Sequence, residues 1–431
     1  MKKFFVFVGC LGLLSSCNKD NDGPSSVTAL TVTIEAGVDR AGNDDWFIVR
    51  NHATGEVIDY KNVKPGESVK FETNKTLDDN KIDVTWLAVD EYTVDGTAGK
   101  QRSCSAPTYL GIEAGGEIKL KAVPESTGGS TQPTIVGHYK ILISHLPTDY
   151  SISLSDKYGL LGDYGVAEYP GDYYLSGDNI DIRNDASTHM ISVNTHSGDP
   201  KYLMLENLKD LDKVNKDYSD FKSFDKIVQF KLPDAYEIEA FVTGFDGPVG
   251  GGSLSLSSYA LTNSLPYLNN DSYNAPRSSI NLGFLNKFPN YVIELNANGF
   301  DYVSKGPAPT AINYTDPSVF SINDKSLTHF AASSSQSYLY RTVYYGYSEK
   351  NELGGNTYMS VSFISGAEGA AHYQPFPQEL LTKFSINPDK IQYSEASFVI
   401  KGESFSDHVD YVLFNGNNPP APYEKITLTV H

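Results

Sequence analysis

Short runs in which apolar and polar residues alternate make up much of this 431-residue chain. Alternation with a period of two gives a β-strand one apolar and one polar face. Several short strands divided by Gly, Asn, Asp and Pro clusters are typical of a β-sandwich or barrel. The 29 tyrosines and 21 phenylalanines favour the same fold, because aromatic side chains suit a pleated, half-buried surface. The first five runs are ALTVTIEA (29–36), DWFIVRN (45–51), ESVKFET (67–73), KIDVTWLAVD (81–90) and GEIKLKAV (116–123).

Length and a linker predict several domains. A chain of 431 residues corresponds to roughly three domains at about 150 residues each. The stretch PESTGGSTQP (124–133) is typical of a flexible linker. The pattern Leu-Pro-x-x-Tyr-x-Ile-x occurs at Leu146 and again at Leu232, which favours tandem units. We predict an all-β protein of tandem immunoglobulin-like β-sandwich domains with little helix. The predicted parts are a sandwich at 28–123, a linker at 124–134, a second β domain at 135–245 and a C-terminal β-rich domain at 246–431, or one unit over 135–431.

Helix is expected in two places only. Residues 201–214 (KYLMLENLKDLDKV) place leucines three residues apart, and residues 377–384 (PQELLTKF) suit one or two turns. Trp46 and Trp86 share strand faces with aliphatic residues, so we expect both in the core.

The N-terminus has the layout of an export signal. Met1-Lys2-Lys3 is positive, residues 4–14 are uncharged, and two serines follow. A positive segment, a short apolar run and a small-residue end are typical of a signal peptide. A membrane-spanning helix needs about 20 apolar residues, so this run is too short to span. We predict a signal peptide at 1–16.

The end of this signal, Leu14-Ser15-Ser16-Cys17, resembles the bacterial lipobox. The resemblance implies that Cys17 becomes the first mature residue and is acylated, which anchors the chain to a membrane through lipid. The next residues, 18–22 (NKDND), resemble the acidic tag of Bacteroidetes-type surface lipoproteins. That resemblance, confined to the first 22 residues, implies outer-membrane attachment facing the cell exterior, with residues 17–27 as lipidated cysteine and tether. The alternative is a plain secretion signal in which Cys17 is incidental.

The charge of the chain argues against nucleic-acid binding, and its cysteine content argues against an internal disulfide. Without Lys2 and Lys3 the mature chain has 32 basic and 53 acidic residues, a net charge of −21. Nucleic-acid binding depends on cationic contacts to phosphate, so we expect no such partner. Cys104 is the one cysteine left after Cys10 and Cys17, and it has no partner for an internal disulfide.

Sequence motifs for catalysis are absent. There is no HExxH, GxSxG, phosphate loop or GxGxxG after a strand, so we predict no catalytic residues, metal ligands or cofactor. His189 and His196 are seven residues apart, which puts them on opposite faces of a strand. The stretch 161–185 offers oxygen ligands for calcium in Asp178, Asp181 and Asp185, without EF-hand spacing; solvated turns are the alternative.

The candidate binding site is SYLYRTVYYGY (337–347). On a strand Tyr338, Tyr340 and Tyr344 share one face. Three aligned phenol rings form a platform of the kind that grips sugar rings; the alternative is aromatic pairing within the sheet. The sequence therefore predicts a non-catalytic cell-surface lipoprotein that binds a glycan or another envelope protein, accessory to nutrient uptake or adhesion. The alternative is a surface carbohydrate-active hydrolase with carboxylates on its loops.

Overall fold

The protein is described by a computed structural model. It covers residues 26–38, 44–77, 79–94, 96, 99–121, 133–148, 150–162, 164–169, 172–195, 198–247, 249, 258–264, 276–367, 375–414 and 422–431. Cys17 and the predicted signal peptide lie outside the described residues. Strands dominate and helices are few and short, so the predicted β class is confirmed. In the described part, no helix is long and apolar enough to cross a membrane.

The first β-sandwich is formed by the N-terminal strands. In its smaller sheet β1 is antiparallel to β4 on one side and parallel to β7 on the other. The facing sheet contains β3, β2, β5 and β6 in that order. Phe47, Phe71 and Ile82 are fully buried between the two sheets. The bounds are β1 (Val27–Ile34), β2 (Asp44–Asn51), β3 (Val57–Asn62), β4 (Ser68–Thr73), β5 (Lys81–Tyr92), β6 (Lys100–Glu113) and β7 (Gly116–Leu120).

The larger sheet of this sandwich continues through the middle of the molecule as a sheet of 12 strands. Beyond β6 the order is β26, β25, β27, β28, β22, β21, β18 and β19. β6 and β26 run parallel, with Ala106 opposite Val361. Arg102 of β6 strengthens this junction by binding Glu352, 250 residues later in the chain. The added strands are β18 (Ile238–Phe245), β19 (Ser258–Ser264), β21 (Asn290–Ala297), β22 (Phe300–Gly306), β25 (Tyr340–Lys350), β26 (Gly354–Gly366), β27 (Gln392–Lys401) and β28 (Tyr423–Val430).

A second β-sandwich follows the predicted linker. One sheet has the order β11-β12-β8-β15 and the other β10-β9-β13-β14-β16. Their inner faces enclose a separate core that includes Tyr139, Leu154 and Ile191. The strands are β8 (Ile135–Leu146), β9 (Tyr150–Asp156), β10 (Gly159–Leu160), β11 (Gly165–Tyr169), β12 (Asp172–Arg183), β13 (His189–Thr195), β14 (Lys201–Leu205), β15 (Lys213–Asp217) and β16 (Lys222–Ser223).

One helix prediction is wrong and one is confirmed. Residues 201–214 form β14 and the start of β15, joined by a turn in which Asn207 and Leu211 have positive φ. The leucine spacing therefore comes from a strand followed by a turn. Residues 377–384 contain α1 (Gln378–Lys383). The other short helices are η1 (Tyr218–Asp220), η2 (Pro317–Val319), η3 (Pro388–Lys390), α2 (Phe405–Val409) and η4 (Asp410–Phe414).

The largest core lies under the central sheet. It includes Phe230, Phe300 and Phe398 and is covered on its outer side by short elements. The strand β18 ends at Phe245 and pairs with both β19 and β21, so hydrogen bonds cross the predicted boundary after residue 245. The covering strands are β17 (Lys226–Tyr236), β20 (Arg277–Phe284), β23 (Phe320–Asp324) and β24 (Ala331–Ser334).

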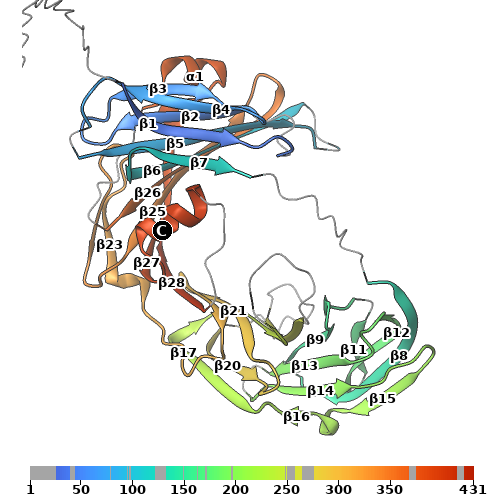
Figure 1. Cartoon of the computed structure of the whole chain (residues 1–431). Coiled ribbons are helices and arrows are strands. Elements are labelled where there is room, and N and C mark those ends of the chain that lie inside the picture. Colours follow the sequence, from blue (N-terminus) through green and yellow to red (C-terminus); the bar gives the residue numbers. More distant parts are fainter. Residues whose placement is uncertain are drawn as a thin grey trace, which may run out of the picture.

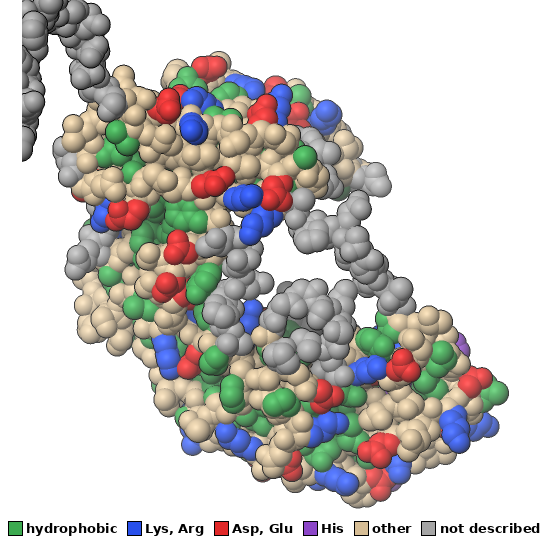
Figure 2. Space-filling view, in the orientation of Figure 1, with side chains coloured by type: hydrophobic (Ala, Val, Ile, Leu, Met, Phe, Trp, Pro, Cys, Tyr) green, Lys and Arg blue, Asp and Glu red, His purple; other side chains and the backbone are tan. Residues whose placement is uncertain are grey.

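The molecule curves like the letter C, with the first sandwich at one end and the second at the other (Figure 1). The long central sheet forms the back of the curve. Acidic and basic side chains are interspersed on the face drawn in Figure 2. Both tryptophans pack against the cores but are only partly buried, so the prediction that they lie in the core is met in part. The Trp86 ring stacks on Phe47 at 5.6 Å and its Nε1 donates to Asp45 at 2.7 Å.

Substitution of Gly111, which lies at a bend in β6, tests how tightly the first sandwich is packed. Its φ is +70°, and an added Cβ would lie 3.3 Å from the His52 ring. That ring is fixed by Asp83, whose Oδ1 lies 2.6 Å from His52 Nδ1 and accepts from Gly111 N–H at 2.8 Å. We expect Gly111→Ala to lower the free energy of unfolding, measured in urea, by about 2–4 kcal/mol, from the left-handed backbone and crowding together.

Gly115 supplies the control for this substitution. Its φ is +89°, but among the described residues, its two chain neighbours aside, no atom lies within 4 Å of an added Cβ. Gly115→Ala is therefore expected to cost only the backbone contribution, about 1–2 kcal/mol. Equal losses in the two variants would show that the contact with His52 contributes nothing.

Candidate functional site

The three tyrosines predicted as a platform do not share one open surface. Tyr338 precedes β25 and packs against Phe320 and Phe398 of the central core. Tyr340 is only 2% exposed. Tyr344 is half-buried on the same face of β25 as Tyr340. Tyr340 is thus not placed to contact a ligand without rearrangement, whereas Tyr344, farther along the same face, is partly exposed.

Tyr344 belongs to a face that we call the hydroxyl face: the parts of β25, β26, β6 and β5 that the smaller sheet of the first sandwich leaves uncovered. Cross-strand pairing places Tyr344 opposite Ser362, Gly346 opposite Ser360, and Ser348 opposite Tyr358. Residues paired across a ladder point to the same side of the sheet. On β6 the neighbours are Ser103, Ser105 and Pro107.

The extent of this face follows from the size of the sheet that packs on it. The core of the first sandwich includes Tyr109 and Ile112 of β6 and Ile364 of β26. Earlier residues of β6 and β26, such as Ser105 and Ser360, are exposed. The three-stranded sheet is thus too narrow to cover the longer strands, which extend beyond it as a polar surface.

Two further tyrosines lie on the hydroxyl face, and sequence reasoning missed both. Tyr358 of β26 is 43% exposed and Tyr92 of β5 is 39% exposed. Tyr92 is paired with Gln101, two residues before Ser103 on β6. Tyr358 lies opposite Ser348, four residues beyond Tyr344 on β25, which separates these rings by about 13 Å along the strand. Between them lie glycine and serine, so the floor is flat.

The rim of the hydroxyl face carries charge and a polar depression. Glu395 of β27 lies opposite Tyr344, and its carboxylate is 3.4 Å from His431 Nδ1. His431 in turn lines a depression of about 380 Å³ at the end of β28. The other lining residues are Asn298, Gly299, Asp316, Pro317, Ser318, Thr429 and Val430.

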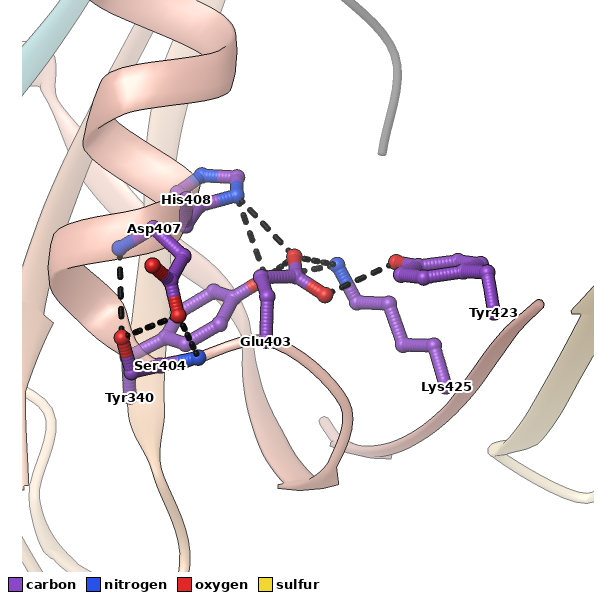
Figure 3. A network of polar contacts seen from close by, with 7 residues as sticks. All are labelled: Tyr340, Glu403, Ser404, Asp407, His408, Tyr423 and Lys425. Carbon is purple, nitrogen blue, oxygen red and sulfur yellow. Dashed lines mark hydrogen bonds and ion pairs between the residues drawn. The ribbon is translucent and has the colours of Figure 1, made fainter. Parts of the chain in front are cut away.

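Beside the hydroxyl face, Tyr340 belongs to a buried network centred on Glu403 (Figure 3). Glu403 Oε1 accepts from the Tyr340 hydroxyl at 2.6 Å and from Lys425 Nζ at 3.2 Å. Glu403 Oε2 accepts from the Tyr423 hydroxyl at 2.8 Å. His408 Nδ1 lies 3.3 Å from Oε1, and its ring stacks on Tyr340 with centroids 4.6 Å apart. The network joins β25, β28, α2 and the turn after β27.

The first turn of α2 holds His408 in place. Ser404 is the N-cap and accepts from Asp407 N–H at 3.2 Å, while the Asp407 carboxylate accepts from Ser404 N–H at 3.3 Å. This reciprocal capping box satisfies two backbone donors at the helix start. The spacing Ser-x-x-Asp is visible in the sequence, so this cap could have been found there. Glu403 and Lys425 lie on different elements and no motif joins them.

The electrostatics of the network favour a structural role. Burial would raise the pKa of Glu403, but hydrogen bonds from His408 and Tyr340 and the charge of Lys425 outweigh it and hold that pKa well below its usual range. Burial and the hydrogen bond to Glu403 raise the pKa values of Tyr340 and Tyr423 well above theirs. General acid–base catalysis works best with pKa values near the working pH. These three groups are shifted away from neutrality.

The three aspartates considered as calcium ligands lie on β12 and in the turn after it. Asp178 binds Lys140 at 3.1 Å, and Asp181 lies 3.0 Å from His138 Nδ1. Asp185 has a φ of +56° in the turn that follows. Among the described residues, no group of three or more His, Cys, Asp or Glu side chains is placed to hold a metal.

No protein-family model matches this chain, and no curated protein matches it either. The geometry of the hydroxyl face is therefore the guide to function.

Proposed function

We propose that this chain is a non-catalytic lipoprotein of the bacterial outer membrane, displayed to the exterior, that binds glycan chains on the hydroxyl face. In this proposal Cys17 carries the lipid, and the two β-sandwiches are the immunoglobulin-like modules predicted from the sequence. The single observation that carries the proposal is the flat, uncovered strip between Tyr344 and Tyr358, with exposed Ser105 and Ser360 on its floor.

The chemistry of this strip suits sugars. A pyranose ring has a C–H face that packs on an aromatic ring and hydroxyl groups that exchange hydrogen bonds at its rim. Tyrosine supplies both an apolar ring face and a polar tip, and serine hydroxyls donate as well as accept. Rings about 13 Å apart along the strand are spaced for more than one sugar unit, so we expect an oligosaccharide rather than a monosaccharide. A shallow site of this kind holds an extended chain without enclosing it.

A glycan array tests the proposal. The mature protein is expected to bind at least one oligosaccharide, and Tyr344→Ala and Tyr358→Ala are each expected to lower the affinity about tenfold, or about 1.4 kcal/mol. Tyr158→Ala is the control, because Tyr158 is a half-buried tyrosine of the second sandwich. Absence of binding to every glycan, or equal binding by all three variants, would contradict the glycan proposal. Release of shorter sugars from a bound glycan would show that the protein is a hydrolase.

An envelope protein as the partner gives a different result on the same variants. Such a partner would be retained from solubilised outer membranes by the parent protein and lost with Tyr344→Ala, while the array stays blank. That outcome would show that the hydroxyl face is the binding site but that its ligand is a protein rather than a glycan.

The lipid anchor is tested independently of the ligand. Cys17→Ser is expected to abolish incorporation of a palmitate analogue and to move the protein out of the membrane fraction, because a sulfur is needed for the thioether. Cys104→Ser is the control, since Cys104 is buried in the central core. A Cys17→Ser protein that still carries label, or an unlabelled parent protein, would contradict anchoring at Cys17.

A further inference from the structure

The strand β19 is the last strand at one side of the 12-stranded sheet, and in the described part of the chain it pairs only with β18. An edge strand presents unpaired backbone groups to which another chain can add. Its sequence, SYALTNS, contains no charged residue and no proline. Those are the residues that usually protect an edge. The strand β17 of the separate two-stranded sheet, by contrast, carries Lys226, Lys231 and Pro233.

The second sandwich covers this edge with side-chain hydroxyls. Ser153 Oγ and Ser192 Oγ, from β9 and β13, lie 3.4 Å and 3.2 Å from the Ala260 carbonyl oxygen and 2.6 Å from each other. One of these hydroxyls therefore donates to the other, which donates to the carbonyl. The Ala260 N–H donates to Ser155 Oγ at 3.1 Å. Both backbone groups of Ala260 are thus satisfied by serines rather than by another strand.

The contact continues one residue further along β19. Asn194 Nδ2 donates to the Leu261 carbonyl at 3.4 Å, and Thr262 Oγ1 donates to Asn194 Oδ1 at 3.4 Å. The side chains of Ser153, Ser155, Ser192 and Asn194 are all buried. They lie on the face of β9 and β13 opposite to the core of the second sandwich, a face that alternation alone would assign to solvent. Their hydroxyl and amide groups thus form hydrogen bonds with β19 that a neighbouring strand would otherwise form.

We propose that the second sandwich is a cap for β19, and that it prevents this strand from pairing with β19 of a second copy of the chain. Two identical antiparallel edges can pair about a two-fold axis, which makes a closed dimer. The opposite edge of the sheet is a poorer partner, since β3 packs beside β4 and Lys61 Nζ bonds the Lys70 carbonyl there at 2.8 Å. Loss of the serine contacts would thus expose the uncharged edge of β19. The best partner for this edge is the same edge of a second copy of the chain.

The triple variant Ser153→Ala, Ser155→Ala, Ser192→Ala tests this role. It leaves both backbone groups of Ala260 without their partners while the core face of the sandwich is unchanged. We expect its dimer dissociation constant, measured by sedimentation equilibrium, to fall at least tenfold below that of the parent. Hydrogen exchange should show the β19 amides more protected in the dimer than in the monomer.

Ser151→Ala is the matched control. Ser151 lies on the same face of β9 and is buried, and among the described residues its hydroxyl has no hydrogen-bond partner. This variant should associate like the parent. If the triple variant does not fold, as judged by near-ultraviolet circular dichroism, the single variants Ser153→Ala and Ser192→Ala each leave one donor to Ala260 and should show smaller shifts of the same sign. Parent-like association of the folded variants, or a dimer with unprotected β19 amides, would overturn the proposal.

Discussion

Glu403→Gln is expected to lower the free energy of unfolding by about 3–5 kcal/mol at pH 7, the usual result of breaking a buried ion pair by removing one partner. Glu403 accepts from Tyr340, Tyr423 and Lys425 in a site with little access to water. The amide keeps the size of the side chain but not its charge, so the Lys425 ammonium loses its counter-ion. The Tyr340 and Tyr423 hydroxyls also lose a charged acceptor. Urea unfolding at pH 7 measures the loss.

An exposed glutamate on the same strand as Lys425 gives the control. Glu424 pairs with Lys401 at 2.8 Å, and its side chain is 37% exposed. Exposed ion pairs contribute about 0–1 kcal/mol, so Glu424→Gln should change the stability little. Similar losses in the two variants would contradict the claim that burial makes the Glu403 network strong. Since the pKa of Glu403 is lowered on folding, its contribution is complete above the unfolded pKa of about 4.3 and declines as the pH falls below that value.

The second large effect is acid sensitivity caused by His189. This side chain is fully buried in the second sandwich, with Nδ1 3.0 Å from the Tyr139 hydroxyl and Nε2 3.2 Å from the Ala186 carbonyl. Burial lowers the pKa of His189 to about 4. Between this value and the unfolded value of about 6.5, the unfolded chain binds a proton that the folded chain does not. Stability should therefore fall by about 3 kcal/mol as the pH drops from 6.5 to 4.

The His189→Gln variant should remove most of this slope, and unfolding in urea at several pH values measures it. Asp156 works in the opposite sense. Burial raises its pKa, against the lowering effect of the Tyr158 N–H and Arg183, so the folded state takes up its proton more readily and gains stability as the pH falls. An Asp156→Asn background separates the two effects. Parallel stability curves for the parent and His189→Gln would refute the assignment to His189.

The β class could be predicted from the sequence because alternation and turn residues are local properties. Local patterns also located α1 correctly. The prediction of a helix at 201–214 was wrong for a physical reason. Leucines three residues apart fit a helix, but Asn207 and Leu211 adopt positive φ in a turn. The apolar residues before this turn belong to a strand and face the core of the second sandwich.

The candidate site was only partly visible in the sequence. Alternation along β25 correctly put Tyr340 and Tyr344 on one face, yet it could not show that Tyr340 lies beneath Glu403 and α2. Tyr92 and Tyr358 join that face through strand pairing between distant segments, which no local pattern encodes. Coverage of a sheet depends on the width of its partner sheet, and that width is a property of the tertiary structure.

The parallel contact between β6 and β26 has a consequence for biogenesis. Synthesis proceeds from the N-terminus, so β6 is complete long before β26 has been made. Until then β6 lacks its neighbour, and an uncovered strand is open to wrong partners. Contacts between distant segments also slow folding. The chain is thus expected to need a holding chaperone during synthesis, and a nascent chain that stops before Gly354 should be degraded or aggregate.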